Sequence, residues 1–430
     1  MNILSLPLLA RTLAAVAWAD TPTMVTPAVF RDTPTDPANH PNLWKTAAPA
    51  DTFARGAWWN LFNDPTLDDL IVRALAANQD LRGAAARVEQ ARASAGLAQS
   101  NLWPQIAAHG AGVREQTSAT TDNVFPDTLT TSIRTPLTIS WELDLFGRVR
   151  HLNASARAEA EASAATFESV RLALTTEVAA TYFSLRALDH ELSLVRDGIG
   201  LRRRARDLAQ SRFAHGLATE LDVVRAEAEV ATTEAELAAL ANRRASHQNA
   251  LSVLLGAPAP DFVVTTASIE HTAPPLVPPG LPSDLLERRP DIAAAERALA
   301  AATARIGVAR AAFFPAISLT GSAGYASGEI DQLFRVDSLV WSFGPSLYLP
   351  IFQGGRNRAQ LQRSSAAYAE AIASYRQRVL VAFREVQDAL TAMRLSRSNR
   401  PLRNGRWWRP AARWNSPKRV TTPAWFRFSK

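Results

Sequence analysis

Residues able to do chemistry are few in this sequence, and their spacing forms none of the common catalytic or metal-binding motifs. No Cys occurs among the 430 residues, which excludes thiolate ligands, disulfides and cysteine nucleophiles. The seven His residues include no pair at i and i+4, so we expect no metal ion and no cofactor. The motifs GxxxxGKS/T, GxSxG and HExxH are absent, which argues against a P-loop NTPase, a serine hydrolase and a zinc protease.

The closest approach to an acid–base pair is Glu142 and Asp144, two carboxylates in one short segment. This segment alternates between apolar and polar positions, with Leu137, Ile139, Trp141, Leu143 and Leu145 set against Thr138, Ser140, Glu142 and Asp144. Such alternation predicts a β-strand with one apolar and one polar face. We therefore interpret the two carboxylates as lining a water-filled lumen, and we expect that the protein is not an enzyme.

A second candidate site is the segment RFAHGLATELDVVRAEAEV, residues 212–230, in which one glycine interrupts a long helical pattern. Gly216 can take the left-handed conformation that ends a helix. Thr219 can cap the helix that follows. The segment therefore predicts a reversal of the chain between two helices, with its tip near residue 216.

The two helices that this tip joins are unusually long. From Arg148 to Phe213 no Pro occurs and apolar residues recur at steps of three or four, which predicts a helix of roughly 100 Å. After the tip the pattern becomes heptad, which is typical of a left-handed supercoil. We expect the buried seam of this second helix to consist of Leu221, Val224, Ala228, Ala231, Ala235, Ala238 and Ala245. The predicted helical hairpin spans residues 148–256.

An internal repeat organises the chain into two halves. Residues 78–106 resemble residues 289–317 at an offset of 211, and residues 166–185 resemble residues 374–393 at an offset of 208. Each half reads as helix, strand, strand and long helix, the first over 58–256 and the second, incomplete, over 283–395. The predicted strands lie at about 105–116 and 132–146, and at about 315–327 and 338–352. Residues 257–282 form the predicted linker.

The two ends of the chain differ in composition from its body. Residues 1–19 are apolar and end in an A-x-A-like site, which predicts a possible export signal, and residues 20–57 read as an extended segment. The net charge of +7 resides in the stretch from Arg394 to Lys430, which has eleven Lys or Arg and no acid. We interpret residues 396–430 as a basic, Trp-rich tail in a non-native reading frame. The alternative is a genuine segment that binds a membrane or nucleic acid.

Several long motifs, in a fixed order over about residues 57–395, resemble those of the TolC-like outer-membrane efflux channels. The resemblance is closest to the branch that serves resistance–nodulation–division pumps. The motifs are WWNLFNDPTLDDLI, NLWPQI, SWELDLFGRVR, RFAHGLATELDVVRAEAEV, LLERRPDI, ARIGVARAAFFPAISLTGS and FQGGRNRAQL.

This resemblance implies a mainly α fold with a β-barrel contribution. Three subunits would each give four strands to a twelve-stranded transmembrane β-barrel that stands on a long periplasmic α-helical barrel. The protein would lie in the bacterial outer membrane, extend into the periplasm and act as a passive conduit for solutes or drugs in a tripartite efflux system. Its partners would be a periplasmic adaptor protein, an inner-membrane efflux transporter and outer-membrane lipid, with no nucleic acid. Because the sequence lacks Cys, we expect no lipid anchor.

The resemblance also implies roles for residues at the hairpin tip. The residues that correspond to the adaptor-docking tip are Phe213, Gly216, Leu217, Thr219 and Leu221. Asp222 and Arg225 correspond to the charged region that closes the tunnel mouth. The alternative for these two residues is a purely local role in capping the tip.

Two other functions remain open from the sequence. The chain could be a nonfunctional remnant of an efflux channel, because the second tip motif would lie after residue 395 and does not occur there. Because a full tunnel needs both hairpins from each subunit, we expect that the chain as written cannot assemble a sealed, gated channel. It could instead be a coiled-coil periplasmic adaptor-type protein, but an adaptor would have one hairpin flanked by β-rich segments, and the duplicated order argues against it.

Overall fold

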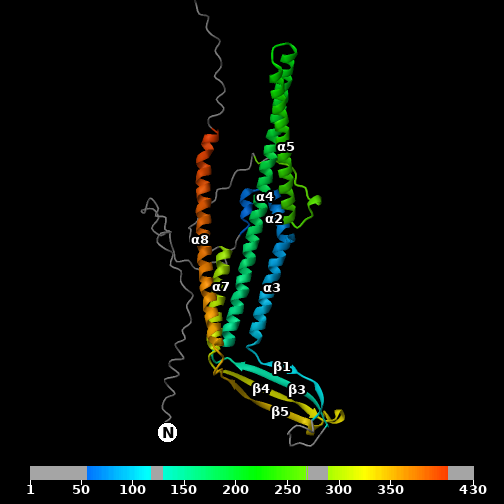
Figure 1. Ribbon diagram of the computed structural model, residues 1–430, viewed down its shortest axis with the longest axis vertical. Helices are drawn as coiled ribbons and strands as arrows, with labels where there is room; N and C mark the ends of the chain where they lie inside the picture. Colours follow the sequence, from blue (N-terminus) through cyan, green and yellow to red (C-terminus); the bar gives the residue numbers. More distant parts are fainter. Residues whose placement is uncertain (1–55, 118–128, 268, 270–288, 405–430) are drawn as a thin grey trace, which may run out of the picture. The chain divides into compact units, whose positions relative to one another are not determined.

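The computed structural model describes residues 56–117, 129–267, 269 and 289–404 of the chain (Figure 1). The longer helices are α2 (Pro65–Ala77), α3 (Gln79–Ser100), α4 (Arg148–Ala214), α5 (Glu220–Leu254), α7 (Pro290–Ala311) and α8 (Arg356–Asn404). The 3₁₀ turns within the described ranges are η2 (Trp58–Phe62), η3 (Ala259–Asp261), η4 (Ile330–Gln332) and η5 (Val336–Ser338). The strands are β1 (Gln105–Ala108), β2 (Ala111–Gln116), β3 (Leu129–Leu143), β4 (Ala316–Ser327) and β5 (Leu339–Tyr348). The expected export signal, nearly all of the extended N-terminal segment, much of the linker and the tail beyond residue 404 lie outside the described residues.

The duplicated order of the sequence is visible in the elements themselves. α3 and α7 each contain 22 residues and begin 211 residues apart, at Gln79 and Pro290. The long helices α4 and α8 begin 208 residues apart, at Arg148 and Arg356. These are the offsets of the sequence repeat, so each half has the order helix, strand, strand, long helix.

All strands join one antiparallel sheet in the order β1–β3–β4–β5, with β2 also paired to β3 (Figure 1). β1 and β2 keep a single register against β3, since Ala108 lies opposite Leu137 and Ala111 opposite Arg134. They therefore correspond to the one strand expected at about 105–116. The interruption lies opposite Pro136, whose carbonyl accepts the N–H of His109 at 2.9 Å but which has no N–H to return.

The sheet has two chemically different faces. Ile139, Gly321 and Phe343 lie side by side on one face. Their chain neighbours Ser322 and Ser342 lie on the other face, where their hydroxyls are 2.9 Å apart. Large side chains of the apolar face stay exposed in the single chain, including Ile106, Leu137, Leu339, Trp341, Phe343 and Leu347. The alternation predicted for β3 thus continues into the paired central parts of β4 and β5.

Two strands end earlier than predicted. β3 ends at Leu143 rather than near residue 146, and β5 ends at Tyr348 rather than near residue 352. The physical reason is clear at β3. The carboxylate of Asp144 accepts the backbone N–H groups of Val149 and Arg150 at 3.1 and 2.8 Å. It therefore serves the first turn of α4, whose positive dipole end favours an anion.

Helix α4 is the centre of the helical packing, with α2, α3, α5 and α7 against it. The largest buried cluster surrounds it: Trp59, Leu67, Leu70, Ile71, Ala74, Leu81, Leu174, Val178, Ala179, Tyr182, Leu185, Leu251, Leu255, Phe262 and Val264. α7 lies close against α4 at Gly307, where an added Cβ would lie 2.5 Å from the ring of His151. The absence of a side chain at Gly307 is what permits this approach.

The hairpin of α4 and α5 packs through a heptad seam, but not through the predicted one. The buried residues of α5 are Val223, Val230, Thr233, Leu240, Leu251 and Ser252, with Ala226, Leu237, Arg244 and His247 half-buried in the same row. The predicted seam from Leu221 to Ala245 is exposed. Both rows repeat every seven residues, and the row with the larger Val and Leu side chains buries more apolar surface.

Helix α8 continues to Asn404, so the prediction that the helical pattern stops near residue 395 is wrong. Pro401 falls in the last turn, where the missing N–H costs one helical hydrogen bond without ending the helix before it. The chain divides into two compact units, residues 1–378 and 379–430. Of the second unit, the described residues form the final part of α8.

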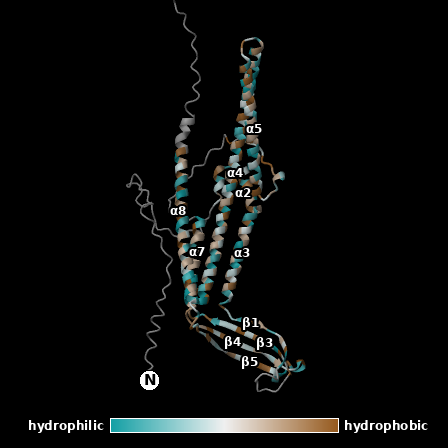
Figure 2. Ribbon diagram, viewed as in Figure 1, coloured by the Kyte–Doolittle hydropathy of each residue, from teal (hydrophilic) through white to brown (hydrophobic). Residues whose placement is uncertain are grey.

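Polar residues occur along all the helices that Figure 2 colours by hydropathy. Within the described ranges, no helix is both long enough and apolar enough to cross a membrane.

Candidate docking tip and conduit surface

The chain reverses at the glycine that the sequence singled out. Gly216 has a φ of +70°, in the left-handed region, directly after α4. Its N–H donates to the carbonyl of Phe213 at 2.9 Å, and the N–H of Leu217 donates to the carbonyl of Arg212 at 2.8 Å. This pair of bonds is the Schellman arrangement, which satisfies carbonyls that the helix end leaves without partners.

Thr219 is the N-cap of α5, as predicted, and it forms a capping box with Asp222 at the third helical position. Asp222 accepts the backbone N–H of Thr219 at 3.0 Å and the hydroxyl of Thr219 at 2.8 Å. These bonds from Thr219, together with the positive charge of Arg225, lower the pKa of the Asp222 carboxyl below its ordinary 3.8. Asp222 thus has a local capping role, and a role of Asp222 and Arg225 at a tunnel mouth stays a prediction.

The apolar side chains of the tip point into solvent. Leu217 is 78% exposed, Leu221 is 56% exposed and Phe213 is 46% exposed. In a Schellman ending the residue after the glycine usually packs back on the helix. Leu217 does not pack back on α4, so the turn exposes this leucine side chain to solvent. The structure gathers the predicted docking residues at one tip, while docking itself stays a prediction.

Replacing Gly216 with Ala is expected to destabilise the tip by about 1 kcal/mol, because an L side chain is disfavoured at positive φ. Gly200 is the matched control, since it lies inside α4 and an added Cβ there meets no atom within 4 Å. Gly200→Ala should stabilise the helix by roughly 0.5–1 kcal/mol. Hydrogen exchange of the amides in the tip and in α4 measures both changes in stability. If both substitutions stabilise the protein, or both destabilise it, this account is contradicted.

The cap at Asp222 gives the tip a defined pH dependence. Because the folded-state pKa is lowered, the contribution of the carboxylate is fully present above pH 3.8 and is lost as pH falls through the folded-state value. The chain has no Cys, so a single nitroxide label at Ala218 can report local mobility. We expect Asp222→Asn to loosen the label at pH 7 and to match the unmodified tip in strong acid. A difference that persists unchanged into strong acid would disprove the role of the charge.

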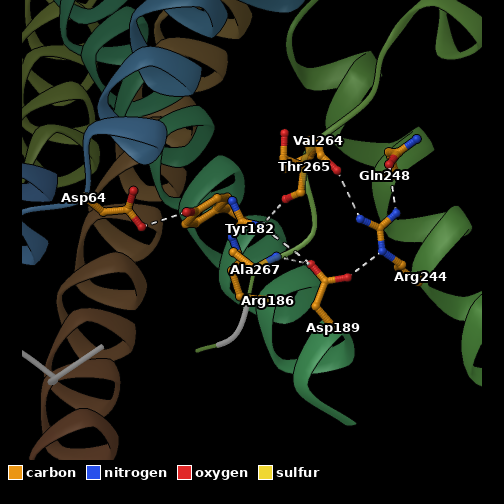
Figure 3. A network of polar contacts seen from close by, with 9 residues as sticks. All are labelled: Asp64, Tyr182, Arg186, Asp189, Arg244, Gln248, Val264, Thr265 and Ala267. Atoms are coloured by element: carbon orange, nitrogen blue, oxygen red, sulfur yellow. Dashed lines mark hydrogen bonds and ion pairs between the residues drawn. The ribbon is translucent and has the colours of Figure 1, made fainter. Parts of the chain in front are cut away.

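Further down the hairpin, a buried polar network joins four segments of the chain (Figure 3). The side chain of Asp189 is only 3% exposed and accepts Arg244 Nε at 2.6 Å. It also lies 3.5 Å from Arg186 Nη1 and accepts the N–H of Ala267 at 3.2 Å. One buried carboxylate therefore holds α4, α5 and the segment after η3 together.

The two arginines extend this network to backbone carbonyls and to an aromatic ring. Arg244 donates to the carbonyl of Val264 at 3.1 Å, and Arg186 donates to the carbonyl of Thr265 (Figure 3). Arg186 also lies 4.7 Å above the ring of Tyr182, a cation–π contact.

Tyr182 connects the network to the start of α2. The Tyr182 hydroxyl donates to Asp64 at 2.7 Å (Figure 3). Burial and this bond raise the pKa of Tyr182 above its ordinary 10.0. The other carboxylate oxygen of Asp64 caps α2 by accepting the N–H groups of Thr66 and Leu67. Sequence reasoning missed the network, because its charges resemble ordinary surface charges of a helix.

Glu142 and Asp144 turn out to stabilise the junction between β3 and α4. Glu142 accepts both Nε and Nη2 of Arg148, at 2.7 and 2.5 Å, a bidentate pair. Asp144 pairs with Arg150 Nε at 3.1 Å. Glu142 shares the hydroxyl-rich face of the sheet, where its cross-strand neighbour is Ser318. Each carboxylate is thus paired with an arginine in the first turn of α4, which is a structural role.

The sequence was compared with known families and proteins. The model of the outer membrane efflux protein family matches residues 70–257 and 281–404. The toluene efflux pump outer membrane protein TtgF of Pseudomonas putida is 38% identical over 335 residues, which cover 78% of this chain and 70% of that protein. The cation efflux system protein CusC of Escherichia coli is 33% identical over 342 residues, covering 79% of this chain and 73% of that protein.

Solved structures agree with this relationship. The outer-membrane channel OprN superposes with a TM-score of 0.76 at 33% identity, covering 80% of this chain and 78% of that one. Crystal structures of CusC superpose with a TM-score of 0.73 at 31% identity, covering 82% and 81%. These relatives are outer-membrane components of efflux systems, which favours the channel over the adaptor-type alternative. The chain belongs to the outer membrane efflux protein family.

Proposed function

We propose that this chain is the outer-membrane conduit of a tripartite efflux system, a passive path for solutes that an inner-membrane pump drives outward. The observation that carries the proposal is the two-faced sheet. One face presents large apolar side chains suited to lipid, and the other presents Ser and Thr hydroxyls suited to water. The protein works by lining a path and needs no catalytic group.

The sheet gives a reason to propose a homotrimer. Among the described residues, no further strand pairs with its two outer edges, which are β1 with β2 on one side and β5 on the other. Unpaired strand edges are costly in a membrane, so the sheet must close on itself or on copies. Four strands are too few to enclose a lumen. Three copies joined edge to edge would satisfy every edge and enclose one.

The helical hairpin supports the proposed partners. α4 has 67 residues, so the tip lies roughly 100 Å along the helix from its start at the sheet. With the sheet in the outer membrane, this length carries Leu217 and Leu221 deep into the periplasm. A periplasmic adaptor that bridges to the inner-membrane transporter would meet these exposed leucines first.

A pair of adjacent substitutions on opposite faces of β5 tests the proposed function. Phe343→Arg places a charge on the face proposed to meet lipid, and we expect it to reduce insertion by about 2–4 kcal/mol per subunit. Ser342→Arg places the same charge on the proposed lumen face, so it should preserve insertion and change conductance or ion selectivity. Planar bilayers measure both, together with native mass spectrometry of the oligomer.

The result that contradicts the proposal is equally specific. Equal effects of the two arginines on insertion would mean that the faces do not differ in their surroundings. A stable monomer with no conductance, from protein that is folded by circular dichroism, would reject the homotrimeric conduit.

A further inference from the structure

The loop between β4 and β5 exposes several large apolar side chains beside its charged ones. Three large apolar residues point outward, since Ile330 is 75% exposed, Phe334 is 73% exposed and Val336 is 85% exposed. Single exposed apolar residues are ordinary, but three within seven positions of one loop are not. This loop therefore presents an apolar surface that requires a partner.

Several polar groups of the same loop form hydrogen bonds with one another. Gln332 Nε2 donates to Glu329 at 2.7 Å, and the Ser338 hydroxyl donates to the carbonyl of Gln332 at 2.8 Å. Backbone bonds from Leu333 to Ile330, from Arg335 to Gln332 and from Ser338 to Arg335 order the two 3₁₀ turns. These bonds order the loop around the buried Leu333, while its apolar and charged side chains both stay exposed.

One contact identifies which side of the sheet this loop extends. The ring of Phe334 packs edge-to-face on Tyr325, with centroids 5.5 Å apart. Tyr325 pairs across the sheet with Leu339 and Thr135, in the register of the apolar face. Phe334 therefore continues the face proposed to meet lipid, and Ile330 and Val336 are exposed in the same loop.

We infer that the β4–β5 loop, through Ile330, Phe334 and Val336, lies in the outer boundary of the membrane and contacts lipid there. This inference rests on the proposed function. The loop is at the end of the sheet opposite the helices, because α4 and α8 follow the other ends of β3 and β5. It is hence the outward end when the helices extend into the periplasm.

The charge of the loop favours apolar contact over electrostatic attraction. Residues 328–338 contain three acids and one Arg, a balance that is repelled by anionic headgroups. Aromatic and aliphatic side chains at the rim of a membrane sheet anchor it at the interface between headgroups and acyl chains. Lipid is therefore the partner that this combination of residues fits.

The absence of Cys makes a direct test possible, because each substitution gives a protein with one thiol. Three single variants, Phe334→Cys, Ile330→Cys and Val336→Cys, are each labelled with an environment-sensitive fluorophore. Each full-length variant is then reconstituted in phosphatidylcholine vesicles. Quenching by doxyl-labelled lipid is compared with quenching by iodide. Trp341→Cys is the reference for the apolar face, and Ser346→Cys is the reference for the polar face.

The expected result is lipid quenching at the three loop positions within about twofold of that at Trp341, with little quenching by iodide. If Trp341 is quenched by lipid and the loop only by iodide, the inference fails and the proposed function stands. Disulfide-linked oligomers through Phe334→Cys would assign the loop to a second copy and also overturn it. If the Trp341 position is itself not quenched by lipid, the proposed membrane sheet fails, and the loop inference with it.

Discussion

Replacing Asp189 with Ala is expected to lower the free energy of unfolding of the hairpin region by about 3–5 kcal/mol. Asp189 is nearly fully buried and faces two guanidinium groups, Arg186 and Arg244, whose side chains are 8% and 17% exposed. Removing the carboxylate leaves two buried positive charges without their shared partner. It also frees the N–H of Ala267, so the segment after η3 loses one of its ties to α4.

Guanidinium-induced unfolding of the detergent-solubilised protein, followed by hydrogen exchange in α4 and α5, measures this loss. The matched control is Glu234→Ala, which breaks the contact to Arg203 at 2.6 Å on the same hairpin. Both of those side chains are largely exposed, at 43% and 56%, so we expect a change of about 0–1 kcal/mol. Similar losses in the two variants would mean that burial does not set the strength of the network.

A further variant separates the missing charge from the lost packing. Replacing Asp189, Arg186 and Arg244 together with Leu or Met removes all three charges at once. Because a buried ion network can be exchanged for apolar side chains with little loss, this variant should recover much of the stability that Asp189→Ala loses. If it is less stable than Asp189→Ala, the hydrogen bonds to the Val264 and Thr265 carbonyls dominate over the unpaired charge.

The elements that the sequence predicted well are those whose signal is local. Alternation predicts β3, and the glycine between two helical patterns predicts the reversal at Gly216. The helix lengths follow from the absence of Pro between Arg148 and Phe213. Each of these depends on neighbours within a few positions, so the residues alone carry the information.

The features that could not be predicted depend on residues far apart in the sequence, or on which of two rows with the same seven-residue period is buried. Asp189 and Arg244 are 55 positions apart, and nothing in the sequence marks them as partners. The seam of α5 is a choice between rows that share a seven-residue period, and the row through Val223 packs on α4. Asp222 looked like a gate residue, while the fold also uses it to cap the helix at Thr219.

Changing Leu217 to Glu is expected to weaken binding of a periplasmic adaptor at least about tenfold, if the hairpin tip is the docking site. Leu217 is the most exposed of the three large apolar residues of the tip, at 78%, so its replacement should disturb little packing. A partner that covers it would gain its full apolar area, and a glutamate buried there would have to be desolvated without a compensating charge. The fold of the hairpin should be unchanged.

Leu201→Glu is the matched control for this effect. Leu201 is 61% exposed on α4, about 20 Å of helix before the end of α4 at Ala214. The same new charge is therefore introduced on the same hairpin outside the proposed docking tip. Binding to immobilised adaptor, measured for both variants in detergent, should fall for Leu217→Glu and stay within about twofold for Leu201→Glu. Equal weakening by the two glutamates would attribute the loss to general charge repulsion and would remove the tip as the docking site.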